Sequence, residues 1–74
     1  MVTAESSAPL AVNLRCNRAR IKATQEDVAN GVGVTASAIA SYENGTSVPS
    51  FRVLINLADY YMVSLDSLVG RINK

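Results

Sequence analysis

Apolar residues along most of the chain recur at helical spacing. Leu10, Leu14 and Arg18 follow one another at intervals of four and share one helical face, and Pro9 is suited to the first turn of that helix. Arg18 falls on an otherwise apolar face, and a charged side chain at such a position needs an explanation. Residues 1–8 show no such periodicity, which predicts a flexible N-terminal arm before the first helix.

Four further short helices are predicted after this one. They start at residues that favour helix N-termini, namely Thr24, Thr35, Pro49-Ser50 and Ser64. Two of them end at glycines that accept a left-handed backbone, Gly33 and Gly45. The fourth has the broadest apolar face, made of Phe51, Leu54, Ile55, Leu57, Ala58 and Tyr61. No stretch alternates like a strand, so we expect one all-α domain over residues 9–74, a compact bundle of five helices.

The stretch from Gln25 to Asn44 has the composition of a helix-turn-helix. Ala29 is small where the two helices approach, and Gly33 allows the tight turn between them. Val34 can fill the gap behind the turn, and Ile39 can anchor the second helix. Short helices joined in this way are typical of DNA-binding domains.

With these residues in register, the chain resembles the Cro and phage-repressor type of helix-turn-helix domain, the Xre family. Besides Gln25 and Ile39, the matching segments are Val28–Val34, Ser41–Gly45, Pro49-Ser50 and Val63–Gly70. The resemblance implies a lambda-repressor-like bundle whose third helix, at about residues 36–44, lies in the DNA major groove. It implies a sequence-specific regulator that binds double-stranded DNA, a repressor acting as a homodimer on an inverted repeat.

The resemblance also implies roles for individual residues. The positions expected to contact bases are Thr35, Ala36, Ser37 and Ser41. The positions expected to contact phosphates are Lys22, Gln25, Asn44, Thr46 and Ser47. Arg18 and Glu43 are expected to form a structural ion pair. The apolar C-terminal part is expected to supply the dimer interface, through Tyr61, Leu68, Val69 and Ile72.

The distribution of charge favours an alternative function. The net charge is +1, but residues 23–51 contain three acidic side chains and no Lys or Arg. The third helix also lacks the Arg, Asn and Gln side chains that make the commonest specific base contacts between Ala36 and Tyr42. Since phosphate neutralisation supplies most non-specific affinity, the chain could instead be a protein-interaction module. An antitoxin-like partner would combine this role with weak DNA binding.

Other classes of function are excluded by the composition. The chain has no His, its only cysteine is Cys16, and no pair of carboxylates accompanies a separate nucleophile. We therefore expect no enzyme, no metal site and no cofactor. No apolar run approaches the ~18 residues of a membrane span, and a single cysteine fits a reducing compartment. The expected location is the cytoplasm, away from any membrane.

Overall fold

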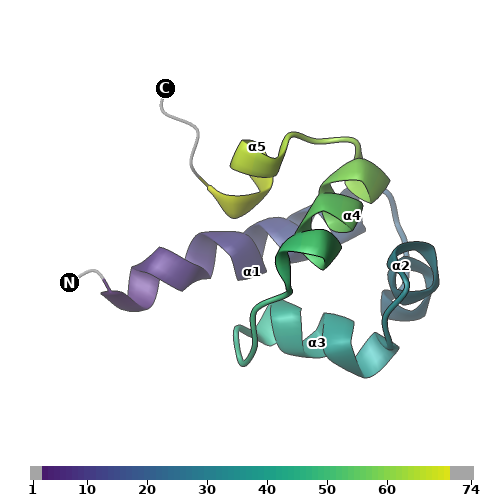
Figure 1. Cartoon of the computed structure of the whole chain (residues 1–74), viewed down its shortest axis with the longest axis horizontal. Helices are drawn as coiled ribbons and strands as arrows, with labels where there is room; N and C mark the ends of the chain where they lie inside the picture. Colours follow the sequence, from purple (N-terminus) through teal and green to yellow (C-terminus); the bar gives the residue numbers. More distant parts are fainter. Residues whose placement is uncertain (1–2, 71–74) are drawn as a thin grey trace.

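The computed structural model describes residues 3–70, and the side chains of residues 9–70. Within this part the chain folds into five α-helices and no strand (Figure 1): α1 (Thr3–Arg20), α2 (Gln25–Val32), α3 (Ala36–Asn44), α4 (Phe51–Tyr61) and α5 (Leu65–Val69). The predicted all-α bundle of five helices is confirmed.

The first helix begins earlier than the sequence predicted. It starts at Thr3 rather than at Pro9, so that Pro9 lies inside α1. The backbone of residues 3–8, which the sequence analysis assigned to a flexible arm, is thus part of α1, while residues 1–2 lie outside the described part. Ala and Glu are strong helix formers whatever their hydrophobic pattern, and a search for apolar periodicity does not detect helix propensity of this kind.

Side-chain caps fix the starts of the other four helices. The hydroxyl oxygens of Thr24, Thr35, Ser50 and Ser64 each accept the backbone N–H three residues on, at 3.0–3.3 Å. Helix α2 has a complete capping box, because the Asp27 carboxylate in turn accepts the N–H of Thr24 at 3.0 Å. These caps satisfy N–H groups that have no partner within a helix, and they set α3 to the bounds that the sequence predicted.

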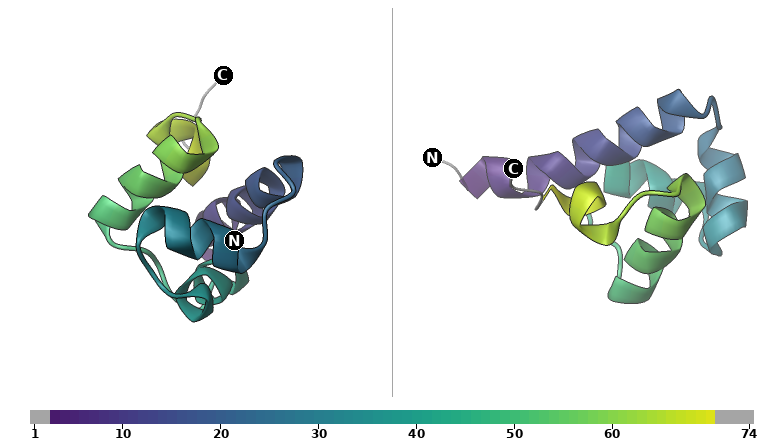
Figure 2. Two further views of the ribbon diagram at one scale, coloured as in Figure 1. Left: turned by 90° about the vertical axis from the view of Figure 1, so that its right-hand side faces the viewer. Right: turned by 90° about the horizontal axis from the view of Figure 1, so that it is seen from above.

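One hydrophobic core joins the helices. Helix α1 lies between α3 and α5, while α2 packs against α3 and α4 (Figures 1 and 2). The centre of the core consists of Leu14, Val28, Ala29, Val32, Ile39, Leu57, Ala58, Tyr61 and Leu68. No helix among residues 3–70 is long and apolar enough to cross a membrane.

The prediction of a dimer interface through Tyr61 and Leu68 is wrong. Both side chains are buried in the core of the single chain, where Tyr61 packs edge-to-face on Tyr60, so neither is available to a partner. Val69 is half-buried, and Ile72 lies outside the described residues. The C-terminal part is apolar because α5 is short and must close the core with few side chains.

The apolar face of α4 is narrower than its sequence suggests. Leu57, Ala58 and Tyr61 are buried, whereas Phe51 and Ile55 are exposed. A stripe of apolar residues shows that a helix is amphipathic but does not show how much of the stripe its neighbours cover.

Candidate nucleic-acid interface

A tight turn fixes the angle between α2 and α3. Gly33 ends α2 with a left-handed φ of 83°, a conformation that costs glycine little. The N–H groups of Gly33 and Val34 both donate to the carbonyl oxygen of Ala29, at 2.9 and 3.0 Å. Val34 packs against the core below the turn, where Ala29 and Ile39 are buried. The turn and the packing residues together hold α2 and α3 as one rigid unit.

A buried ion pair fastens α1 to the end of α3. The Arg18 guanidinium donates from Nε to Glu43 Oε2 at 2.7 Å and from Nη2 to Glu43 Oε1 at 3.0 Å. Arg18 and Glu43, which the resemblance pairs, are thus joined by two parallel hydrogen bonds. The Glu43 side chain is 3% exposed and that of Arg18 26%. A planar guanidinium held in this way fixes orientation as well as distance.

Three more hydrogen bonds extend this pair into a network. Arg18 Nη1 donates to the carbonyl of Ala23 at 3.1 Å, and Gln25 Nε2 donates to Glu43 Oε1 at 3.1 Å. Arg15 Nη1 donates to the main-chain carbonyl of Glu43, at the C-terminal end of α3 where cations are favourable. Because residues from α1, α2 and α3 meet at one carboxylate, the network fixes the orientation of α3 relative to α1 and α2.

The network changes the electrostatics around it. Hydrogen bonding to Glu43 raises the pKa of Arg18 above its ordinary value, against the opposing effect of burial. Burial, assisted by the charge of Glu43, raises the pKa of Tyr61 to about 12. The Tyr61 hydroxyl has no hydrogen-bond partner among the described residues. Because the pKa of Arg18 is raised, its guanidinium stays charged and serves as a structural group.

The outer face of α3 is smooth and carries short side chains. Thr35 and Ser37 are exposed and Ser41 is half-exposed, so these three predicted base-contact positions lie at the surface. Ala36 is also half-exposed, but it packs against the hydrophobic core. The Thr35 hydroxyl accepts the Ala38 N–H as the helix cap, which leaves its hydrogen free to donate. The surface offers hydroxyl and methyl groups, and no cation.

The loop after α3 folds back onto the helix end. The carbonyl of Ser41 accepts the N–H of Thr46 at 3.0 Å, the N–H of Ser47 at 3.4 Å and the hydroxyl of Thr46 at 3.2 Å. The single hydroxyl hydrogen of Thr46 is thus used inside the chain, which argues against its predicted donation to a phosphate. Asn44 and Ser47 are exposed, and their side chains can reach a ligand.

The predicted phosphate contact Gln25 also has a structural partner, because its amide donates to Glu43. Two flanking arginines are engaged as well. Besides the bond from Arg15 to Glu43, Arg20 Nη2 donates to the Tyr61 carbonyl at 2.8 Å. Lys22 and Arg52 are exposed, and no hydrogen bond or ion pair within the described residues involves their side chains.

Sequence analysis missed the structural roles of Arg15 and Arg20. A signal was present, because Arg15 lies one helical turn before Arg18 and therefore faces the same neighbour, α3. Arg20 meets the end of α4 forty-one residues later in the chain. Local spacing could not have indicated a contact at that separation.

Two solved structures are similar to this fold. The chain superposes on the P22 c2 repressor in complex with a synthetic operator with a TM-score of 0.81 and 25% identity, covering 85% of this chain and 96% of that one. It superposes on a transcriptional regulator from Listeria innocua with a TM-score of 0.80 and 29% identity, covering 88% and 61%. The expectation of a lambda-repressor-like bundle, drawn from phage-repressor domains, is confirmed.

Two bacterial proteins are similar to this chain in sequence. An uncharacterized HTH-type transcriptional regulator of Bacillus subtilis, YqaE, is 39% identical over 77% of this chain and 49% of its own length. The cryptic phage CTXphi transcriptional repressor RstR of Vibrio cholerae is 33% identical over 73% of this chain and 48% of its own length. The chain thus spans about half the length of these relatives.

All four proteins are regulators or repressors, in agreement with the expectation that the chain is not an enzyme. A family model described as helix-turn-helix matches residues 18–68. These residues include the complete α2–turn–α3 unit and both partners of the Arg18–Glu43 pair. The chain therefore belongs to the helix-turn-helix family.

Proposed function

We propose that the chain is a transcriptional repressor that binds double-stranded DNA, acting in the cytoplasm as a homodimer on an inverted repeat. The observation that carries the proposal is that α3 is held firmly on the domain with its outer face uncovered. Helices α1 and α2 pack on its inner side, and no other helix of residues 3–70 covers its outer face (Figure 1). The Arg18–Glu43 pair fastens α3 to α1 in a fold similar to that of a repressor solved in complex with operator DNA. A two-fold dimer would place one α3 in each of two half-sites about one helical turn apart.

In this proposal the start of α3 contacts base edges. The hydroxyls of Thr35 and Ser37 would donate to or accept from bases, and the methyl of Ala36 would touch a thymine methyl. Ser41, one turn further on, would lie at the edge of the contact. Since each of these contacts distinguishes only weakly between base pairs, much of the sequence specificity would come from the shape and deformability of the DNA.

Few cations would serve the phosphate contacts. Arg15 and Arg20 are exposed but donate to main-chain carbonyls. Lys22 and Arg52, which are exposed and have no hydrogen bond or ion pair within residues 9–70, would therefore be the main cations for phosphates, with Asn44 and Ser47 as neutral donors. Two neutralised phosphates per copy give a dimer a slope of log K against log salt of roughly −3 to −4. Affinity should therefore fall by about two orders of magnitude between 50 and 200 mM salt.

The experiment is a selection of bound duplexes from a random DNA pool at low salt and at near-physiological salt. We expect enrichment of an inverted repeat with half-sites about one helical turn apart. Uncontacted positions rich in A and T would identify readout of shape. If nothing is enriched at either salt concentration, the proposal is wrong.

The surface chemistry favours one second candidate, a protein-interaction module or antitoxin-like partner. Between Ala23 and Phe51 the chain carries only negative charges, and the outer face of α3 is made of small side chains that let another backbone approach. This candidate predicts no selected DNA site. It also predicts that the immobilised wild-type chain captures a protein from the native host and that the immobilised Ser37→Glu variant does not capture it.

A further inference from the structure

The chain contains two asparagines that are followed by glycine, Asn30 and Asn44. In such a pair the main-chain nitrogen of the glycine can attack the side-chain amide carbon of the asparagine and close a succinimide ring. A glycine favours this attack, because it has no side chain to obstruct the approach and its backbone turns freely. Every other asparagine precedes a residue with a side chain. Both pairs are therefore candidate sites of deamidation, and their sequences do not distinguish them.

The first pair, Asn30-Gly31, is held within a helix. Both residues belong to α2, which ends at Val32, so this helix must open before the ring can close. The side chain of Tyr60 on α4 also lies against Gly31, because a Cβ at that position would collide with Cε1 of the tyrosine ring. Close packing of an aromatic ring opposes the rotation that the attack requires. We therefore expect Asn30 to be stable in the folded chain.

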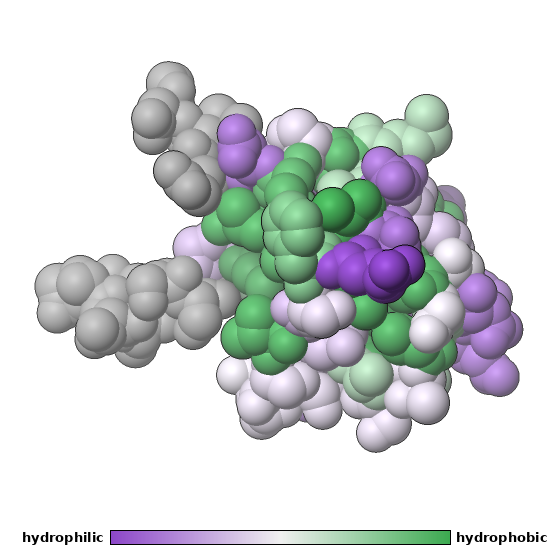
Figure 3. Space-filling view, in the orientation of Figure 1, coloured by the Kyte–Doolittle hydropathy of each residue, from purple (hydrophilic) through white to green (hydrophobic). Residues whose placement is uncertain are grey.

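The second pair, Asn44-Gly45, lies where α3 ends. Asn44 is the last residue of α3 and is exposed. Gly45 follows with a left-handed φ of 80°, and apart from its chain neighbours no described residue has an atom within 4 Å of where its Cβ would be. The surface over α3 carries small side chains of intermediate hydropathy, which are pale in Figure 3. Rotation about the bonds of Asn44 would thus disturb only the end of a helix.

The attacking nitrogen of Gly45 is loosely held. Its N–H is shared between the carbonyls of Ser41 and Tyr42, and the distance to the Tyr42 oxygen is 3.3 Å. The Ser41 carbonyl also accepts the N–H groups of Thr46 and Ser47 and the hydroxyl of Thr46. A long hydrogen bond is weak, and so is one to a carbonyl that several donors share. Freeing this nitrogen therefore costs less than freeing a nitrogen within a helix.

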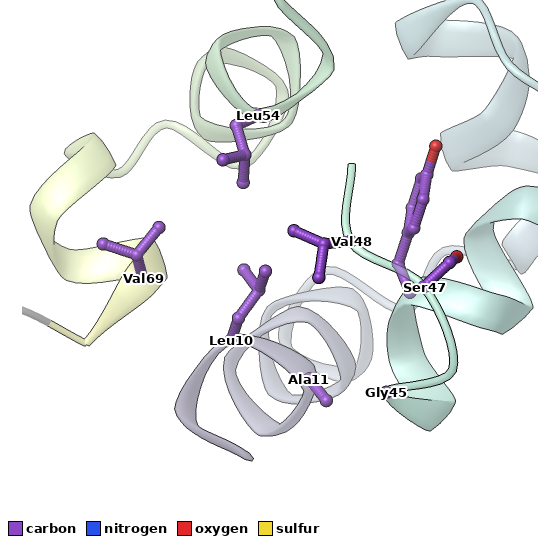
Figure 4. A pocket seen from close by; sticks show the side chains of 8 residues that line it. Leu10, Ala11, Gly45, Ser47, Val48, Leu54 and Val69 are labelled. Carbon is purple, nitrogen blue, oxygen red and sulfur yellow. The ribbon is translucent and has the colours of Figure 1, made fainter. Parts of the chain in front are cut away.

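A hollow beside the loop after α3 gives the backbone of that loop room to move. Its volume is about 250 Å³, and Gly45 and Ser47 line it from the loop (Figure 4). The facing walls include the apolar side chains of Leu10, Leu54 and Val69. Voids larger than a water molecule are few in packed protein interiors, so the loop is not backed by close-packed side chains on this side. It can change its conformation without displacing the core.

We propose that Asn44 is a deamidation site of the folded chain, with the main-chain nitrogen of Gly45 as the nucleophile. Hydroxide removes the proton of that nitrogen, which then bonds to Cγ of Asn44 while the side-chain nitrogen leaves as ammonia. Water adds to either carbonyl of the resulting succinimide and opens the ring, which gives aspartate or isoaspartate. No electrons are gained or lost, and the net change converts an amide and a water molecule to a carboxylate and an ammonium ion.

The effect on DNA binding rests on the proposed function, in which Asn44 donates to a phosphate. Deamidation replaces this neutral donor with a carboxylate, which repels phosphates. No Lys or Arg between residues 23 and 51 compensates for the new charge, and a negative charge is unfavourable at the C-terminal end of α3. In isoaspartate the main chain also runs through an additional carbon, which displaces the loop from the helix. The chain should therefore lose DNA affinity as it ages.

The first test measures deamidation without DNA. Wild-type chain is kept at mildly alkaline pH, either folded or in guanidinium chloride, and is analysed by mass spectrometry. Digestion after Glu43 places Asn30 and Asn44 in separate peptides. In the folded chain we expect Asn44 to react at least about tenfold faster than Asn30, and in denaturant we expect similar rates. If Asn44 reacts no faster than Asn30 in the folded chain, or if the same ratio persists in denaturant, the proposal is wrong.

The products and the pH dependence identify the route. Opening of the ring gives isoaspartate together with aspartate, and fragmentation in the mass spectrometer distinguishes the two. The rate should rise with pH, because base generates the nucleophilic nitrogen of Gly45. Aspartate alone, formed at a rate that does not depend on pH, would show direct hydrolysis of the side chain and would overturn the role of Gly45.

DNA binding then separates this inference from the proposed function. After incubation, wild type and Asn30→Gln should bind a selected duplex at least about threefold more weakly than before. Asn44→Gln should keep the affinity that it had before incubation, because glutamine closes its larger ring far more slowly. An equal loss of affinity in Asn44→Gln would show that the loss does not come from Asn44. If fresh wild type binds no duplex, the proposed function fails, and mass spectrometry still decides whether Asn44 deamidates.

Discussion

Removing Arg18 should destabilise the domain far more than its partly exposed position suggests. In Arg18→Ala the carboxylate of Glu43, whose side chain is 3% exposed, loses both hydrogen bonds from Arg18. Breaking a buried pair in this way costs ~3–5 kcal/mol. Two features reduce that cost, because Gln25 still donates to Glu43 and water can enter where Arg18 was 26% exposed. We therefore expect a loss of about 2–3 kcal/mol.

This loss is large for a domain of this size. Stabilities of ~0.05–0.15 kcal/mol per residue give a chain of 74 residues about 4–11 kcal/mol. With a change of ~4–8 °C for each kcal/mol, the melting temperature should fall by roughly 10–20 °C. Circular dichroism during heating measures the shift, and urea denaturation measures the free energy of unfolding.

Two further variants make this prediction specific. Arg52→Ala removes an exposed arginine and should change stability by no more than ~0.5 kcal/mol. The double variant Arg18→Met/Glu43→Leu replaces the pair with apolar side chains and should recover most of the loss. If Arg18→Ala is no less stable than Arg52→Ala, the reasoning that the pair holds α3 in place is refuted.

Other predictions concern Tyr61 and the cap of α2. Tyr61→Phe removes a buried hydroxyl that has no partner among the described residues and should raise stability by up to about 1 kcal/mol. Since burial raises the pKa of Tyr61 from 10.0 to about 12, wild type should lose stability as the pH rises from 10 to 12, and urea titrations should show a shallower loss in Tyr61→Phe. Thr24→Ala should cost about 1 kcal/mol, measurable by thermal denaturation. Because hydrogen bonds from Thr24 hold the pKa of Asp27 below 3.8, the stabilising effect of the capping box is present above that pH and lost as the pH falls below it.

Most of the fold could be predicted because its signals are local. The hydroxyl caps Thr24 and Thr35 and the glycines Gly33 and Gly45 mark helix ends within a few residues, and the structure has α2 and α3 at the expected bounds. The extension of α1 before Pro9 was missed, because propensity alone continues that helix.

The environment of the site was harder to predict, because it depends on contacts distant in the sequence. Whether Tyr61 and Leu68 are covered or exposed depends on how α5 sits on α1 and α4, and their hydrophobicity is the same in both cases. Likewise Arg15 and Arg20 look like phosphate contacts by charge. Only the fold shows that they donate to carbonyls at the ends of α3 and α4.

The most direct test of DNA binding through α3 is an equilibrium titration of a selected duplex with wild type, Ser37→Glu and Ser67→Glu. Both serines are exposed in the first turn of a helix, where a new carboxylate is compatible with the helix dipole. Their helices, α3 and α5, pack on different sides of α1 (Figure 1). Fluorescence anisotropy should show at least about tenfold weaker binding for Ser37→Glu, because its charge faces the phosphates, and no change for Ser67→Glu. If the two variants bind as tightly as wild type, α3 does not contact the DNA and the proposed function is contradicted.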